Sequence, residues 1–355
     1  MLYKPDWEKS KQRFEALWEN EIIDRCCISV MAPKDGGEPY EPYPEKYEDQ
    51  IKYWTDPEWI LRRNIRMMEN TFYGGDAIPM INTAIGPCAH AAFFGCEYSF
   101  KENTVWFEEA IKDWDTDELK FDPKNKLYLQ FKKNLQYLSK EGKGKFFVAM
   151  PDHTSSIDAL AHIRGSENVL TDLFLEPENV KAALKTITDV WIDTNNDYYG
   201  YTQPCNDGGS CVGWLNTWAP GRHSQLQCDI SVMISPEFFE EFVMEELTRA
   251  ADSMDYPIYH FDGVEQIRHL DMLLSIKNLK MIQWTQVAGQ PSITENIPVL
   301  QKIQAAGKGL LINSWDMPKI RTLIDNLSPK GLYIVTYLQN ESDARDLLKI
   351  VEKFR

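Results

Sequence analysis

Polar side chains of a few types gather where short apolar segments end, and these types suit acid–base or metal chemistry. His260 and Asp262 are two residues apart, so in a strand both side chains leave on the same face. A histidine and an aspartate placed in this way can bind a metal ion, relay a proton or hold a substrate amine. The structural alternative is that Asp262 caps a helix beginning at Val264.

A second pair, Asp152 and His153, ends another apolar segment and precedes Thr154. Asp152 could donate or accept a proton, or it could cap the next helix, and both interpretations stay open. The candidate catalytic residues are therefore His260, Asp262, Asp152 and His153.

Aromatic side chains make up 12% of the chain, and some lie near other expected strand ends. Aromatic walls hold a methylammonium group by cation–π attraction or an aryl ether by stacking. The candidate substrate-binding residues are Trp214, Trp218, His223, Asp229, Gln283, Trp284, Trp315 and Tyr337.

Eight short apolar segments recur along the chain, and longer helical patterns separate them. These segments do not alternate polar and apolar residues, which indicates strands buried on both faces. They span residues 26–33, 77–85, 146–152, 210–218, 257–262, 280–286, 309–315 and 331–337. Helices are predicted at 58–73, 177–198, 235–255, 264–276 and 341–354. Strand and helix repeated eight times predict an α/β fold with a single (β/α)8 TIM barrel, whose catalytic groups lie at the carboxyl ends of the strands.

Two segments are expected outside this repeat. Residues 86–126, after the second strand, should form a cap insertion over the barrel mouth, and an N-terminal helix at 7–18 should close the bottom or pack on the side. The whole chain, 1–355, is expected to be one domain. A doubly wound open sheet is the alternative, but no GxGxxG turn follows the first strand.

Charge and composition exclude several classes of partner. With 38 basic and 54 acidic residues the net charge is −16, so a nucleic-acid partner is not expected. Apolar runs are too short to span a membrane, and the charged N-terminus does not resemble a signal peptide. Seven cysteines without a CxxC pair suggest reduced thiols in a cytoplasmic protein. The sequence leaves open whether the chain forms a homodimer.

Several stretches resemble the uroporphyrinogen decarboxylase superfamily, which also includes zinc- and corrinoid-linked methyltransferases. They are QLQCDISVMISPEFFEEFVMEEL with PIYHFDG, FYGGDAIPMINTAIGPCAHAAFFGC, and KGLYIVTYLQNESDARDLL. The resemblance covers about residues 55–350 and implies a (β/α)8 barrel with its active site in the mouth.

Departures from the family pattern separate its branches. The decarboxylase has an arginine-bearing loop after its first strand, whereas residues 31–37 here (MAPKDGG) contain no arginine, so uroporphyrinogen is not the expected substrate. The thiol methyltransferases have His-x-Cys after the fifth strand, which is His260-Phe261-Asp262 here. The resemblance thus places a tentative metal site, possibly for zinc, on His260 and Asp262. Such a pair favours oxygen-rich coordination or no metal.

The resemblance implies a methyltransferase that demethylates a small methylated compound, either a methylamine or a methoxylated aromatic. The acceptor would be a corrinoid on a separate protein, because this chain has no corrinoid-binding DxHxxG motif. His260, His153 or a metal ion would activate the leaving group. Two alternatives are a decarboxylase-like enzyme on a small non-porphyrin substrate and a non-catalytic ligand-binding barrel.

Overall fold

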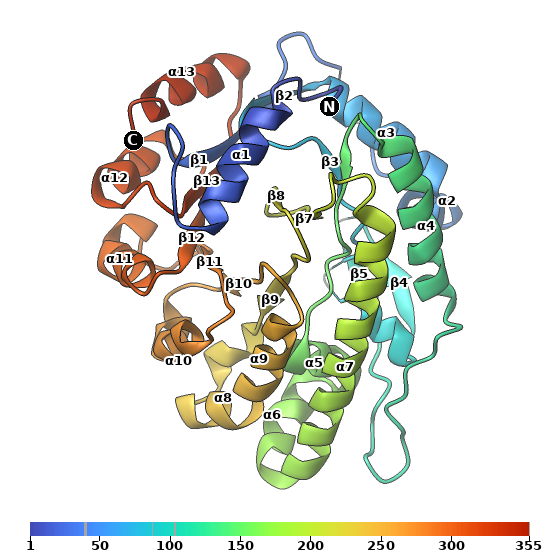
Figure 1. Cartoon of the computed structure of the whole chain (residues 1–355). Helices are drawn as coiled ribbons and strands as arrows, with labels where there is room; N and C mark the ends of the chain where they lie inside the picture. The colour runs from blue at the N-terminus through green and yellow to red at the C-terminus, as the bar shows by residue number, and fades with distance from the viewer. Residues whose placement is uncertain (39–40, 87, 103, 355) are drawn as a thin grey trace.

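The structure is a computed structural model that describes residues 1–38, 41–86, 88–102 and 104–354 (Figure 1). The α-helices are α1 (Trp7–Trp18), α2 (Tyr47–Thr55), α3 (Pro57–Glu69), α4 (Lys126–Gly142), α5 (Ser156–Arg164), α6 (Ser166–Leu175), α7 (Pro177–Thr202), α8 (Pro236–Phe242), α9 (Met244–Asp252), α10 (Leu270–Ser275), α11 (Ile297–Ala305), α12 (Met317–Asn326) and α13 (Glu341–Val351). Short 3-10 helices are η1 (Ala89–Phe94), η2 (Asp229–Met233), η3 (Val264–His269) and η4 (Ile293–Asn296).

The strands form one large sheet and three small pairs. They are β1 (Cys27–Pro33), β2 (Thr71–Gly75), β3 (Met80–Ile81), β4 (Tyr98–Phe100), β5 (Val105–Phe107), β6 (Phe147–Val148), β7 (Ser210–Val212), β8 (Thr217–Ala219), β9 (Gln225–Gln227), β10 (Ile258–Phe261), β11 (Met281–Trp284), β12 (Gly309–Asn313) and β13 (Leu332–Tyr337). The large sheet has the order β2-β1-β13-β12-β11-β10-β9. Its neighbours are parallel except for β2, which runs antiparallel to β1.

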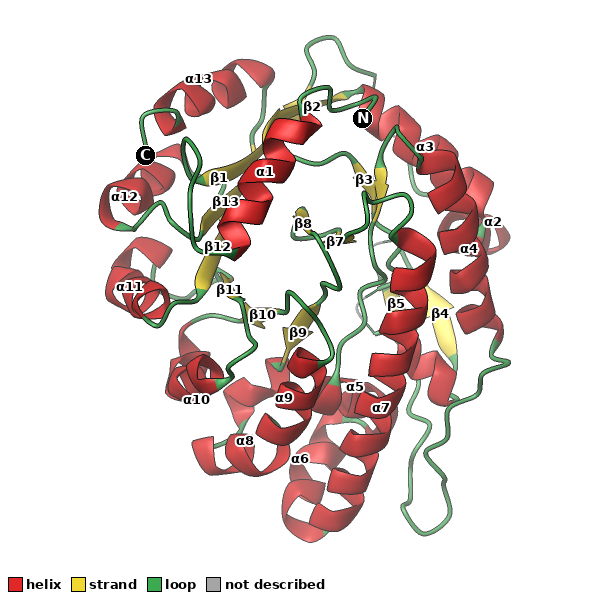
Figure 2. Ribbon diagram, in the orientation of Figure 1, coloured by secondary structure: helices red, strands yellow, loops and turns green. Residues whose placement is uncertain are grey.

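The fold is therefore mixed α/β, with a mostly parallel central sheet of seven strands. Within the described ranges, the ladder of this sheet ends at β2 on one side and β9 on the other. The parallel pair β3–β6 stands across from β12 and β13, and helices surround the strands (Figure 2). An isolated parallel bridge joins Met150 to Val212, next to β6 and β7.

One strand prediction and one helix prediction need correction. Residues 210–218 form the antiparallel hairpin β7–β8 rather than one strand. Asn216 turns the chain there with a φ of +50°, and its side chain bonds to both backbone groups of Ile78. On the side of β10 away from β11, the strand that pairs with it is therefore β9, which runs parallel to it. The predicted helix 58–73 ends at Glu69, because the chain then enters β2.

Helix ends follow the local sequence where capping residues are present. Ser235 accepts a hydrogen bond from the backbone N–H of Phe238 (3.3 Å), and Pro236 begins α8, as predicted. The predicted helix 7–18 is α1, with the same bounds. The described residues of the expected cap, 86–126, hold η1 and the β4–β5 pair before α4 begins.

The two faces of the sheet bury different elements. Tyr259, Ile282 and Ile312 face the convex side and pack in one large apolar cluster with the outer helices. Ile258, Met281 and Tyr333 face the concave side near the amino ends of the strands. There they pack against α1 and the β7–β8 hairpin, which together fill the region that we call the base.

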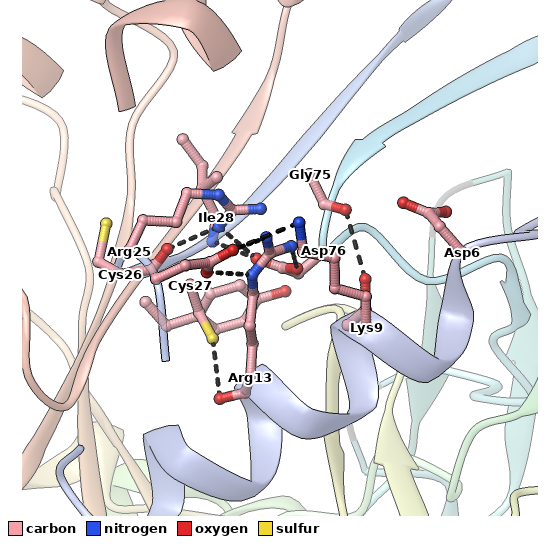
Figure 3. A network of polar contacts seen from close by, with 12 residues as sticks. Asp6, Lys9, Arg13, Arg25, Cys26, Cys27, Ile28, Gly75 and Asp76 are labelled. Carbon is pink, nitrogen blue, oxygen red and sulfur yellow. Dashed lines mark hydrogen bonds and ion pairs between the residues drawn. The ribbon is translucent and has the colours of Figure 1, made fainter. Parts of the chain in front are cut away.

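Buried charges also tie the base together (Figure 3). Arg13 on α1 contacts Asp76 (3.0 Å) and forms two bonds with Asp24 (2.8 and 2.6 Å). Arg25 donates to the other oxygen of Asp76 at 2.6 Å, and the N–H of Ile28 donates to that same oxygen at 3.0 Å. We call Arg13, Asp24, Arg25 and Asp76 the base network.

All seven cysteines lie within the described residues, and they are buried and free, as the sequence suggested. No helix in the described ranges is both long and apolar enough to cross a membrane.

Candidate active site

His260 lies at the carboxyl end of β10, on the concave face of the sheet. Its Nδ1 is 2.5 Å from Oε1 of Gln283 and 3.2 Å from Oγ1 of Thr285. Gln283 is its parallel partner on β11, and the Gln283 amide donates to the same Thr285 hydroxyl at 2.8 Å. Because Oε1 can only accept, this network assigns the proton of the neutral imidazole to Nδ1. Nε2 is therefore left as the acceptor.

Trp214 packs beside this imidazole. The two ring centroids are 5.2 Å apart and the ring planes are nearly perpendicular, at 85°. Trp214 follows β7, so the hairpin that fills the base also delivers an aromatic wall to the site. The Trp214 Nε1 atom is buried without a hydrogen-bond partner among the described residues.

Asp229 supplies the nearest carboxylate. Its Oδ1 is 3.9 Å from Nε2 of His260, and its Oδ2 accepts a bond from Gln227 at 3.1 Å. Burial raises the pKa of Asp229 and the charge of Asp262 raises it further, whereas His260 lowers it. An imidazolium on His260 would gain from this carboxylate, so the pair can store or move a proton.

Asp152 lies after β6 and accepts a hydrogen bond from the amide of Gln225. Gln225 and Gln227 are two residues apart on β9, so the strand aims both amides to one side. Burial, and then the charge of Asp229, raise the pKa of Asp152 to about 7. A carboxyl with such a pKa can exchange a proton near neutral pH.

Asp158, on α5, lies beneath Asp229. Its two oxygens accept the backbone N–H groups of Asp229 (2.7 Å) and Ile230 (3.1 Å). Its pKa is raised, first by burial and then by the charge of Asp229. The carboxyl edge, as we call the strand ends with Asp152, Asp158, Asp229, His260 and Asp262, thus concentrates acidic groups.

Asp262 follows β10 directly and is half-buried. The next residue, Gly263, has a φ of +81°, and a Cβ there would lie 2.1 Å from Oε1 of Gln290. Only glycine fits this turn, which carries the chain from β10 into η3. The helix-capping alternative for Asp262 is not realised, because the residue before η3 is Gly263 and no side-chain cap bond is formed there.

The donor set at the carboxyl edge does not fit a zinc ion. In the described part of the chain, no group of three or more His, Cys, Asp or Glu side chains is arranged to hold a metal. Zinc sites normally need at least three protein ligands. His260 already uses Nδ1 for Gln283, and Nε2 has a single carboxylate nearby.

His153 points away from the other candidates. It is 2% exposed, and its ring lies among Phe93, Phe131 and Tyr198, with His90 at a centroid distance of 4.9 Å. Burial lowers the pKa of His153 to about 3. The expected Asp152–His153 pair is therefore divided: the structure places only Asp152 with His260 and Asp229.

Trp218 and His223 lie in the base rather than at the carboxyl edge. Trp218 is fully buried, and its backbone oxygen accepts a bond from the indole of Trp18 on α1 (2.9 Å). The His223 ring bonds to Thr217 (2.8 Å) and to the Tyr256 carbonyl (2.6 Å). The hairpin explains both positions, because it turns the chain back toward the amino ends of the strands.

The remaining aromatic candidates are scattered. Trp284 is 1% exposed and stacks on Phe261 at 5.3 Å on the convex face, so it cannot line a site with Gln283. Trp315 is 67% exposed in the loop after β12. Tyr337 is half-buried at the end of β13, opposite Met31 in the sheet register.

The site also contains residues that were not among the predicted ones. Gln225 and Gln227 could have been found from their alternation before Asp229, and Thr285 from its place two residues after Gln283. Asp158 had no such signal, because it lies within helix α5 and only the tertiary fold brings it to the strand ends.

Comparison with known proteins gives a likeness of fold. No protein-family model matches the sequence, and no curated protein matches it. A solved structure described as a methyltransferase from Methanosarcina mazei is similar over 97% of this chain and 98% of its own. The TM-score is 0.63 and the sequence identity is 12%. The chain therefore shares its fold with that structure, while membership of the uroporphyrinogen decarboxylase superfamily stays a prediction.

Proposed function

We propose that this protein is a methyltransferase that removes a methyl group from a small methylated compound and passes it to a corrinoid carried by a separate protein. The donor is a methylamine or a methoxylated aromatic. In this proposal the strands of the large sheet, together with β3 and β6, make up a distorted (β/α)8 barrel.

The observation that carries the proposal is the pairing of His260 with Asp229 at a strand end. Their 3.9 Å contact lies at the carboxyl ends of parallel strands, where such folds carry their chemistry. The end-to-end likeness in fold to a structure described as a methyltransferase supports methyl transfer as the proposed reaction, by analogy of fold.

The residues suit the difficult part of the reaction, which is loss of the leaving group. When the methyl group departs, an amine or an aryl oxygen keeps the bonding electron pair. Protonated at Nε2, His260 donates its proton to that atom, while Asp229 stabilises the imidazolium and Gln283 keeps the ring oriented. The Trp214 ring flanks the same imidazole and offers an aromatic wall for the methyl-bearing group.

The methyl acceptor is supplied from outside the chain. A reduced corrinoid provides a cobalt nucleophile when the partner protein is bound. Zinc is not included in the proposal, because the donor set described above does not fit it. The proposed role of the chain is to bind the donor, orient it and hold a proton at Nε2 of His260.

A single assay tests the proposal. The protein is incubated anaerobically with a reduced corrinoid protein and a panel of methylamines and methoxylated aromatics, while the cobalt spectrum is followed. The expected result is conversion of cobalt(I) to methyl-cobalt(III) with one class of donor, lost in the His260→Ala variant. Release of carbon dioxide from a small carboxylic acid would favour the decarboxylase-like alternative. No spectral change with any donor would overturn the proposal.

A further inference from the structure

Asp158 uses its whole carboxylate to hold the backbone that carries Asp229. Its two oxygens accept consecutive N–H groups, from Asp229 at 2.7 Å and from Ile230 at 3.1 Å. The Asp158 residue is 6% exposed, and its bonds cross from α5 to the first turn of η2. Charge-assisted bonds of this kind are stronger than neutral ones, so they fix the start of η2 firmly.

The negative charge of Asp158 is costly where it lies. No Lys or Arg forms an ion pair with Asp158 in the described ranges, and the nearest charged neighbour that affects it is another carboxylate, Asp229. Asp172 offers a contrast on the next helix. It is 5% exposed, and it bonds to Arg164 (2.8 Å) and to the Trp114 indole (2.8 Å).

The backbone around Asp158 carries a further cost. Ser156, the first residue of α5, has a φ of +55°, in the left-handed region that non-glycine residues avoid. Such a conformation costs on the order of 1 kcal/mol or more and concentrates at functional sites. Helix α5 therefore starts under strain and presents a carboxylate that has hydrogen-bond donors but, in the described ranges, no cationic partner.

We propose that Asp158 is a positioning residue, which holds the Asp229 backbone so that the Asp229 carboxylate faces Nε2 of His260. This inference rests on the proposed function for its catalytic consequence. The placement of Asp229 can, however, be measured without any turnover.

The catalytic test compares Asp158→Asn with Asp172→Asn, a matched buried aspartate outside the site. Asparagine keeps one acceptor oxygen, so the fold should persist while Asp229 loses its fixed place. We expect kcat to fall about 10²-fold in Asp158→Asn, with KM nearly unchanged, since misplaced catalytic groups cost factors of this size. The limb of the pH–rate profile that reports Asp229 should move to higher pH, because a displaced Asp229 loses the nearby charge of His260 that lowers its pKa. Asp172→Asn should lower the stability and leave the pH profile in place.

A wild-type rate in Asp158→Asn would overturn the proposal. So would a loss of rate that is equal at every pH and is shared with Asp172→Asn, since that pattern indicates a purely structural role. If Asp158→Asn does not fold, Asp158→Glu takes its place, because it keeps the carboxylate and displaces it by one CH₂ group.

A spectroscopic measurement separates this proposal from the proposed function. The chain has only six histidines, so ¹⁵N-histidine labelling gives a simple spectrum in which His260→Ala identifies the His260 signals. Asp158→Asn should shift the His260 ring signals, and Asp172→Asn should not. If the wild type transfers no methyl group but this shift is seen, the positioning role holds and the proposed function fails. Unchanged His260 signals in Asp158→Asn would overturn the positioning role.

Discussion

The base network and the carboxyl edge each contain a buried aspartate, Asp76 and Asp158, but they differ in how the charges are compensated. At the base, Asp76 is fully buried between Arg13 and Arg25, and each of its oxygens contacts one of the two arginines. At the carboxyl edge, Asp152 and Asp158 lie near Asp229, and in the described ranges none of the three has a Lys or Arg partner.

This difference separates a structural use of charge from a functional one. Buried ions are tolerated when oppositely charged groups and hydrogen bonds satisfy them, as they are at the base. Like charges held close together oppose folding, and they raise pKa values into the range useful for proton transfer. The base network thus anchors α1 to the sheet, while the carboxyl edge keeps groups that can take up or release protons near neutral pH.

The largest effect is expected at the base. Asp76→Ala leaves two buried arginines without their carboxylate, which should lower the free energy of unfolding by about 3–5 kcal/mol. Urea unfolding at pH 7 measures this loss, with Asp262→Asn at the carboxyl edge as the control. A loss below about 1 kcal/mol would remove the contrast between the two regions, since exposed ion pairs contribute no more than that.

The next effect concerns activity. His260→Gln should reduce methyl transfer by about 10²-fold, which corresponds to about 2.7 kcal/mol, because a proton donor is lost. The free energy of unfolding should change little, in contrast to Asp76→Ala. The measurement is the rate of methyl-cobalt formation beside a urea unfolding curve. Full activity in this variant would leave Asp152 as the remaining candidate proton donor.

A smaller effect should appear in the pH dependence of stability. Asp152 has a pKa of about 7 in the folded state, above its ordinary value of 3.8, so the folded chain keeps this proton while the unfolded chain has lost it. The stabilisation from this group is therefore full below about pH 4 and is lost as the pH rises to about 7. Asp152→Asn should remove this slope and raise the stability at pH 8 by about 1–2 kcal/mol.

Urea unfolding of the wild type and of Asp152→Asn, each measured at pH 5 and at pH 8, tests this prediction. The matched control is Asp172→Asn, whose aspartate has an arginine partner. If the difference between the wild type and Asp152→Asn is the same at both pH values, Asp152 does not titrate as described.

The smallest effect is expected from metal removal. Because the carboxyl edge lacks three suitable ligands in the described ranges, dialysis against a chelator should leave the melting temperature and the rate of methyl transfer unchanged. Added zinc should likewise shift the melting temperature by less than about 1 °C, since only a ligand bound to the folded state raises it. A stoichiometric zinc content after purification would contradict this prediction.

Much of the fold could be predicted because the helical periodicity and the unbroken apolar segments are visible in the sequence. Helix α1 matches the predicted bounds, and the unbroken apolar segments at β10 to β13 identify buried parallel strands. The hairpin at 210–218 could not be distinguished from a strand, because its turn depends on Asn216 bonding to Ile78, which is distant in sequence.

The positions of the candidate residues could be predicted where alternation along one strand was enough, and they were missed where tertiary packing decides. The strand period placed His260 and Gln283 correctly on neighbouring strands, and the same period could have excluded Trp284, which must face the opposite side. The His153 side chain points into an aromatic cluster, and no feature of the neighbouring sequence indicates this direction. Asp158 reaches Asp229 across 71 residues of sequence, which no pattern within one element can reveal.

The filled base has a kinetic consequence. Side chains of α1 and the hairpin occupy the concave face at the amino ends of the strands, so for the proposed reaction we expect ligands to approach His260 and Trp214 from the opposite side. A small methyl donor and a much larger corrinoid protein would then share one entrance. For the proposed reaction, the donor must enter first, and its demethylated product can leave only after the partner has departed. Turnover would follow a compulsory order, in which excess partner protein obstructs the entrance and slows the reaction.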